Sequence, residues 1–129
     1  MHLGKPQVRL WYQETGRLSD DIAPPRDFVL WNTIIGEGEA EEAADDALFT
    51  IEVRTQGQQF VRRPLTLSAV DGRGKVLARR TYKSVLTSDA GKVVLPLWVR
   101  DVGCAGTVVF SAGIGVEQQS FTLEFACGE

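Results

Sequence analysis

Side chains capable of acid–base and nucleophilic catalysis are scarce in this sequence. His2 is the only histidine, and we expect it to lie in a frayed N-terminal segment. A Ser-His-Asp triad or a Cys-His pair needs a histidine base that the fold holds in place. The sequence also lacks the glycine-rich motifs Gly-x-x-x-x-Gly-Lys and Gly-x-Gly-x-x-Gly, which cradle phosphates. We therefore predict that the protein is not an enzyme and has no cofactor.

Acidic side chains concentrate in residues 36–46, which contain six carboxylates and no base. Calcium takes six to eight oxygen ligands, so this segment is a candidate metal site. Its residue order does not match an EF-hand loop, however, and its like charges oppose a helix. We predict a mobile acidic loop that holds no metal tightly, with calcium binding as the alternative. The candidate ligands are Glu37, Glu39, Glu41, Glu42, Asp45 and Asp46.

The two cysteines are expected to face each other across the last hairpin. Gly115-Val116 suits a two-residue type II′ turn, because glycine tolerates the positive φ of its first position. The resulting register carries Cys104 to a position opposite Cys127, on the apolar face of the hairpin. Opposed Cα atoms lie about 4.5 to 5.5 Å apart, within reach of a disulfide.

A disulfide between Cys104 and Cys127 would indicate an oxidising compartment, either periplasmic or extracellular. The alternative is a pair of separate reduced cysteines in a cytoplasmic protein, where cysteine is a common buried residue. We predict the disulfide.

Three aromatic residues are candidates for a contact surface. Trp11 and Tyr12 are adjacent in an expected strand, so their side chains point to opposite faces and one of them is expected outside. Trp98 alternates with the apolar residues around it and is also expected to face outward. Such residues favour a protein contact, although flat rings also stack on sugars. Carbohydrate binding is therefore a second alternative.

A basic group is expected on a neighbouring hairpin that turns at residues 71–74. We expect this hairpin to bring Arg62 and Arg63 near Arg79 and Arg80, with Lys83 at its far end. A positive patch there would dock an acidic partner or a neighbouring copy of the chain. Solvation of an ordinary charged surface is the alternative.

Composition limits the classes of partner. The chain has 129 residues, of which 43% are hydrophobic and 24% charged, as expected for one globular domain spanning residues 1–129. Its net charge of -3 disfavours nucleic-acid binding, which needs a basic footprint. No window approaches the roughly 18 to 20 consecutive apolar residues of a membrane span.

Alternation of apolar and polar residues predicts strand after strand, separated by glycine-rich turns. Pro96 should place its strand at a sheet edge or a bulge, because proline cannot donate to a ladder. The predicted strands cover residues 7–13, 28–35, 48–55, 64–71, 75–83, 92–100, 106–113 and 117–127.

This pattern favours an all-β fold, an antiparallel immunoglobulin-like β-sandwich of seven or eight strands. We predict a non-catalytic binding or assembly module that acts through a protein partner or self-association.

Overall fold

The computed structural model describes residues 1–23, 33–35 and 43–125 and shows an all-β protein. These residues form eleven strands, β1 to β11, and no helix. Consequently, no helix in the described part of the chain could cross a membrane. All described strand pairs are antiparallel except that of β3 with β11. The predicted all-β, antiparallel class is confirmed.

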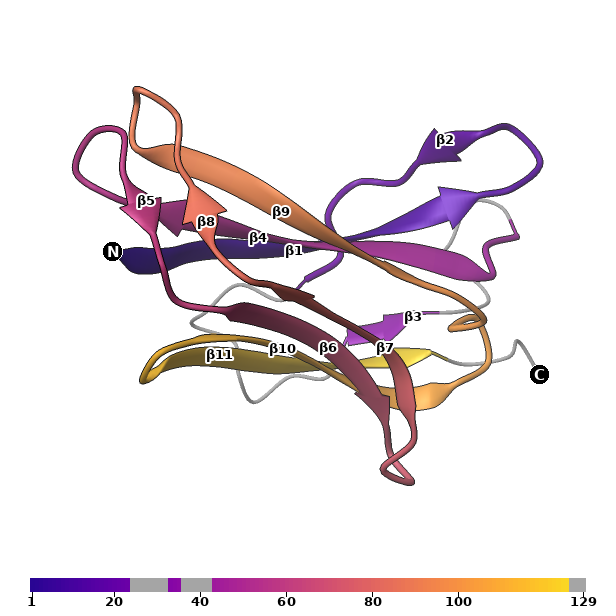
Figure 1. Cartoon of the computed structure of the whole chain (residues 1–129). Helices are drawn as coiled ribbons and strands as arrows, with labels where there is room; N and C mark the ends of the chain where they lie inside the picture. Colours follow the sequence, from indigo (N-terminus) through magenta and orange to yellow (C-terminus); the bar gives the residue numbers. More distant parts are fainter. Residues whose placement is uncertain (24–32, 36–42, 126–129) are drawn as a thin grey trace.

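Sheet A has the strand order β2-β1-β4-β9 and forms the upper layer in Figure 1. The strands are β1 (His2–Tyr12), β2 (Arg17–Leu18), β4 (Asp46–Arg54) and β9 (Lys92–Val99). Every second side chain of β4 is buried, as expected for a strand with one face on the core. Sheet A therefore has an inner apolar face and an outer face of mixed composition.

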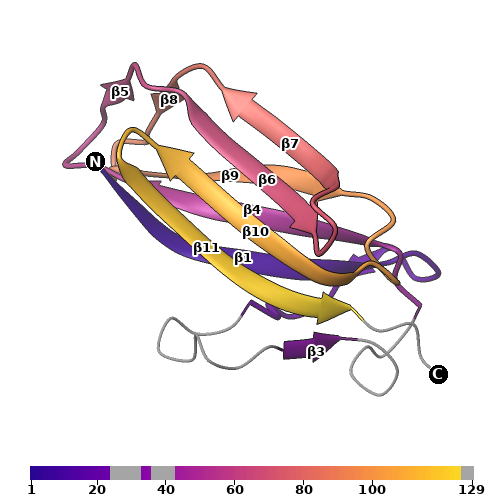
Figure 2. The same ribbon diagram turned by 90° about the horizontal axis from the view of Figure 1, so that it is seen from below.

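Sheet B has the strand order β3-β11-β10-β6-β7 and forms the lower layer. The strands are β3 (Thr33–Ile35), β11 (Glu117–Phe125), β10 (Gly106–Ile114), β6 (Leu65–Asp71) and β7 (Val76–Tyr82). Figure 2 shows β10 and β6 at the middle of this sheet, with β11 and β7 flanking them.

A short ribbon of β5 (Phe60–Val61) and β8 (Val85–Leu86) connects the two layers at one end of the molecule. Sheet A curls into a half-barrel, so the predicted immunoglobulin-like arrangement is not confirmed. Alternation specifies strands and their buried faces, but it does not specify how strongly a sheet curls.

Aromatic rings from both sheets meet in the core. The ring centroid of Phe110 lies 5.4 Å from that of Phe49 in sheet A and 5.4 Å from that of Phe121 in sheet B. The ring centroid of Phe125, also in sheet B, lies 6.2 Å from that of Phe110. Such ring pairs stabilise a fold beyond the burial of their area.

Two local predictions are confirmed by the strand pairing. Ile114 pairs with Glu117 across the turn, and Phe110 pairs with Phe121, as the expected register requires. Gly115 has φ 59°, the positive value expected at the first position of a type II′ turn. Pro96 lies in β9, an edge strand of sheet A.

The acidic segment is described only at its C-terminal end. Residues 36–42 lie outside the described residues, as does most of the predicted strand 28–35. Asp46, predicted to belong to the loop, is instead the first residue of β4 and pairs with Trp11.

Candidate functional site

The outer face of sheet A carries a group of apolar side chains that we call the tryptophan face. Leu18 pairs with Trp11, and Leu48 pairs with Trp98, so these positions share one side of the sheet. Trp98 is 41% exposed and Val94, on the same strand and side, is 50% exposed. The tryptophan face consists of Trp11, Leu18, Leu48, Val94, Pro96 and Trp98.

The two tryptophans contact each other edge to face. Their ring centroids are 5.9 Å apart and their planes meet at 67°. Trp98 Nε1 donates a hydrogen bond to Asp46 Oδ2 at 3.2 Å, which satisfies the indole while its ring stays exposed. The other oxygen of Asp46 accepts the backbone N–H of Asp101 at 3.1 Å. Asp46 thus holds the Trp98 ring to the turn that follows β9.

The orientations expected for the aromatic residues agree with the burial of their side chains. Tyr12 is 3% exposed and belongs to the core, whereas Trp11 is half-buried on the outer face. The Arg17 guanidinium lies 4.8 Å from the Tyr12 ring centroid. Of the three predicted contact residues, the structure brings Trp11 and Trp98 together and places Tyr12 apart from them.

The described acidic candidates already have structural partners. Asp45 Oδ2 accepts from Gln13 Nε2 at 3.1 Å, and the backbone N–H of Asp45 donates to Gln13 Oε1 at 3.0 Å. Asp46 holds Trp98, as described above. Glu37, Glu39, Glu41 and Glu42 lie outside the described residues. Within the described ranges, no three His, Cys, Asp or Glu side chains gather as a metal site would require.

Arg79 and Arg80 point to opposite faces of sheet B. Arg79 pairs with Ser68, whereas Arg80 pairs with the buried residue Leu67. Arg80 therefore shares the inward side of its strand, where its guanidinium lies 4.4 Å from the Tyr82 ring centroid. The expected single basic patch is divided between two faces.

Lys83, rather than Arg79 and Arg80, lies beside the segment of Arg62 and Arg63. Tyr82 pairs with Leu65, so the next residue of the chain continues alongside this segment. Arg62 stacks over the Phe60 ring at 5.6 Å. Lys83 follows β7 at the end of the hairpin away from the turn, as expected, whereas Arg79 and Arg80 lie closer to the turn.

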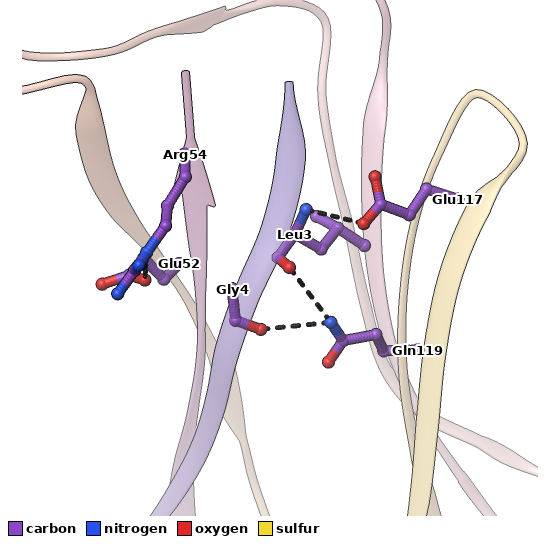
Figure 3. Close-up of polar contacts among 6 residues, drawn as sticks. All are labelled: Leu3, Gly4, Glu52, Arg54, Glu117 and Gln119. Carbon is purple, nitrogen blue, oxygen red and sulfur yellow. Dashed lines mark hydrogen bonds and ion pairs between the residues drawn. The ribbon is translucent and has the colours of Figure 1, made fainter. Parts of the chain in front are cut away.

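Side chains from sheet B close the free edge of β1 (Figure 3). Glu117 Oε1 accepts the backbone N–H of Leu3 at 2.9 Å. Gln119 Nε2 donates to the carbonyl oxygens of Leu3 at 3.2 Å and Gly4 at 3.1 Å. Because these backbone groups are already hydrogen-bonded, this edge offers few free donors and acceptors for pairing with another strand.

The segment after β2 closes the middle of the same edge. Asp21 Oδ1 accepts the N–H of Val8 at 2.9 Å, and Ser19 Oγ accepts the N–H of Leu10 at 2.8 Å. Ser19 is buried, so this hydroxyl is a structural partner for the strand. Both halves of the β1 edge are thus occupied by the chain itself.

The opposite edge of sheet A is interrupted at its centre. Pro96 has no N–H to offer, and its carbonyl oxygen accepts the Tyr82 hydroxyl at 2.6 Å. Burial raises the pKa of the Tyr82 hydroxyl above 10.0, and the positive charge of Arg80 opposes this shift. Because both edges are obstructed, the outer face is the more accessible contact surface of sheet A.

A polar cavity of about 360 Å³ lies at the N-terminal end of β1. The His2 side chain is 84% exposed, and its Nδ1 lies 3.8 Å from Glu117 Oε2. The cavity is lined by Met1, His2, Arg54, Thr55, Gln56 and Gln59.

Cys104 lies in an exposed turn before β10. The ladder of β10 and β11 ends at Gly106, whose φ of 73° turns the chain away from the strand. The expected core-side position of Cys104 is therefore wrong. Cys127 lies outside the described residues, so the disulfide stays a prediction.

We expect non-reducing mass spectrometry of protein from an oxidising compartment to show Cys104 joined to Cys127. Replacing Cys127 with serine should then lower the free energy of unfolding by about 2–4 kcal/mol, because the unfolded chain loses a constraint. Urea unfolding of the oxidised wild type and Cys127→Ser measures this loss. Two alkylatable thiols in unreduced material would contradict the prediction.

Sequence reasoning missed most of the tryptophan face. Val94, Pro96 and Trp98 occupy alternate positions of one strand, so their common side could have been inferred from the period of two. No pattern in the sequence indicates the contact of Trp98 with Asp46, because this contact depends on the pairing of β4 with β9.

Comparison with known protein families, curated proteins and solved structures finds no match for this chain.

Proposed function

We propose that this protein is a non-catalytic binding or assembly module that contacts a protein partner through the tryptophan face. The contact between the half-buried Trp11 and Trp98, which is 41% exposed, carries this proposal. Tryptophan is enriched among the residues that dominate the free energy of protein association. Asp46 holds the Trp98 ring in place, so binding would cost less side-chain entropy.

A protein partner fits the face better than a sugar chain. The planes of Trp11 and Trp98 meet at 67°, so the two rings do not form one flat platform for successive sugar rings. The calcium alternative has less support, because Asp45 and Asp46 already accept hydrogen bonds within the fold. If the predicted disulfide forms, the module would act in the periplasm or outside the cell.

Replacing Trp98 with aspartate should abolish capture of the partner, because a charge would replace the largest exposed ring of the face. The test immobilises the wild type, Trp98→Asp and Leu86→Asp on beads and exposes each to an extract of the source cells. Leu86 is 58% exposed and lies on β8, away from the tryptophan face, so it is a matched control.

Mass spectrometry should find proteins that the wild type and Leu86→Asp retain and that Trp98→Asp does not. Identical sets for all three variants would refute a role for the face. Binding to a glycan array that Trp98→Asp abolishes would instead support the carbohydrate alternative.

A further inference from the structure

We propose that the free edge of β7 binds an extended segment of another protein as an added strand, and that this segment carries two adjacent acidic residues. The site belongs to sheet B and is separate from the tryptophan face, which belongs to sheet A. Three observations support it: the open edge of β7, the excess of basic residues around this edge, and the partly buried apolar side chains beside it.

The outer edge of β7 is open. β7 ends sheet B on the side opposite β3, and no described strand pairs with its outer edge (Figure 2). Its regular stretch runs from Ala78, opposite Ala69, to Tyr82, opposite Leu65. Alternate residues of such a strand direct their N–H and C=O groups away from the sheet. Within the described ranges, no side chain or loop hydrogen-bonds to these groups, so they can pair with an added strand.

β7 lacks the obstructions that protect both edges of sheet A. Glu117 and Gln119 occupy the backbone groups at the start of β1, while Pro96 interrupts β9. β7 contains no proline. Its one irregularity is the register shift at Leu77, which comes before the regular stretch. The backbone of residues 78–82 therefore accepts a partner strand without a break.

Basic residues surround this edge. Residues 55–88 contain seven bases and one acid, although the whole chain has a net charge of -3. The single acid, Asp71, serves the turn before β7, where its Oδ1 accepts the N–H groups of Arg73 and Lys75, both at 2.9 Å. No carboxylate of the described residues forms an ion pair with any of the seven. The bases are Arg62, Arg63, Arg73, Lys75, Arg79, Arg80 and Lys83.

The elements packed against β7 do not reverse this charge. β6 contributes Asp71 and β9 contributes Lys92 as their only charged residues. Asp89 and Asp101 lie in the turns before and after β9, and each is within three residues of a base. A strand added to β7 therefore meets a positive surface, to which an acidic strand is complementary.

Arg79 and Arg80 determine where the acidic residues of the bound segment lie. Arg79 pairs with Ser68 on the outer side of sheet B, whereas Arg80 pairs with Leu67 on the inner side. Both arginines are exposed. Opposed residues of neighbouring strands point to the same side, so one carboxylate on each side requires two adjacent acidic residues. The expected ligand therefore contains a pair such as Glu-Glu or Asp-Glu.

Apolar side chains beside the edge extend the contact. β9 approaches β7 where the Tyr82 hydroxyl donates to the Pro96 carbonyl oxygen at 2.6 Å. An added strand would cover the exposed parts of the apolar residues between the two strands, so apolar residues are expected next to the acidic pair. The partly buried apolar residues of β7 and β9 that pack against the core are Leu77, Ala78, Tyr82, Val93 and Leu95.

The charges disfavour pairing of β7 with β7 of a second copy. Residues 78–82 contain two bases and no acid, so such a pair would bring like charges together. The same repulsion rejects basic strands, which makes the edge selective as well as receptive. An acidic segment of a different protein is the complementary ligand.

A peptide titration tests the proposal. The probe is a fluorescein-labelled peptide of about eight residues, in which valine and threonine alternate and a central Glu-Glu pair replaces one of each. Its fluorescence anisotropy is followed up to about 1 mM of the full chain. Binding should saturate and should weaken at high salt, because exposed charges are screened. The same peptide with Lys-Lys should bind at least tenfold more weakly. No saturable binding of the acidic peptide would overturn the proposal.

Arg79→Glu and Arg80→Glu should each raise the dissociation constant of the peptide about tenfold. Lys5→Glu is the matched control, because it makes the same charge change on β1, which β4 and β9 separate from β7. Two arginine variants are used so that the test survives if circular dichroism shows that one of them does not fold. Affinity that is unchanged in both, or lowered equally by Lys5→Glu, would refute recognition at β7.

N-methylated peptides test the backbone pairing. Methylation of every second amide blocks one edge of an extended peptide and leaves the other edge free. Two acidic peptides, methylated at odd or at even positions, should differ at least tenfold in affinity, because only one keeps the edge that pairs with β7. Equal affinities would show that charge attracts the peptide without strand addition, and the proposal would be wrong.

Two further results separate this site from other surfaces. Trp98→Asp should bind the acidic peptide as tightly as the wild type, because Trp98 lies on the outer face of sheet A. If Trp98→Asp abolishes binding and both arginine variants retain it, the peptide occupies the tryptophan face and the β7 site is refuted. Arginine-dependent binding of a single-stranded oligonucleotide, with no binding of the acidic peptide, would also overturn the proposal.

Discussion

Replacing Gly91 with alanine should destabilise the protein by about 3–5 kcal/mol, which combines backbone strain with overpacking. Gly91 has φ 76°, and a Cβ atom there would overlap the carbonyl oxygen of Thr55 and lie 3.0 Å from the backbone nitrogen of Gly57. The backbone cannot easily move to relieve this overlap, because two hydrogen bonds hold it. The Gly91 carbonyl oxygen accepts the N–H of Thr55, and the Gly91 N–H donates to the Ser88 carbonyl oxygen, both at 2.8 Å.

Gly74 provides the matched control for Gly91. Its φ is 84°, and a Cβ atom there would meet nothing within 4 Å. Gly74→Ala should therefore cost only the backbone penalty of about 1–2 kcal/mol. Urea unfolding of both variants measures the difference, and equal losses would show that the crowding at Thr55 is not important.

Replacing Phe110 with alanine should lower the free energy of unfolding by about 3–5 kcal/mol. Phe110 is fully buried at the centre of sheet B, where its ring contacts those of Phe49, Phe121 and Phe125. Truncation removes the apolar area and leaves a cavity between the two sheets, because neighbouring rings on rigid strands close it only in part.

Phe60→Ala is the control, because Phe60 is 53% exposed on the β5–β8 ribbon. It should cost less than about 1 kcal/mol. The measurement is urea unfolding with a check that the denaturant dependence is unchanged, since a changed slope would indicate an altered unfolded state. A loss for Phe110→Ala no larger than that for Phe60→Ala would contradict the description of the core.

Several features of the fold could be predicted because they depend on residues close in sequence. The turn at Gly115-Val116 fixes the pairing of Phe110 with Phe121, since a two-residue loop leaves one register. The edge position of the Pro96 strand follows from a missing N–H. The outward direction of Trp98 follows from its position relative to its buried neighbours Leu97 and Val99.

Other expectations were wrong where a local rule did not extend far enough. Cys104 was placed on the core side by extending the ladder past Gly106, where a positive φ ends it. Arg79 and Arg80 were assigned to one patch with Arg62 and Arg63, although adjacent residues of a strand must face opposite ways.

By itself, the sequence determined the all-β class and the approximate bounds of the strands after residue 46. It also determined the alternation of buried and exposed side chains along these strands, and the last hairpin. These depend on side-chain period and turn chemistry, which act over a few residues. Only the tertiary structure decided that β4 pairs with both β1 and β9, which brings Trp11, Asp46 and Trp98 together on one face. Strand order and sheet curl depend on contacts between distant segments, and the period of each strand carries no information about which distant strand lies beside it.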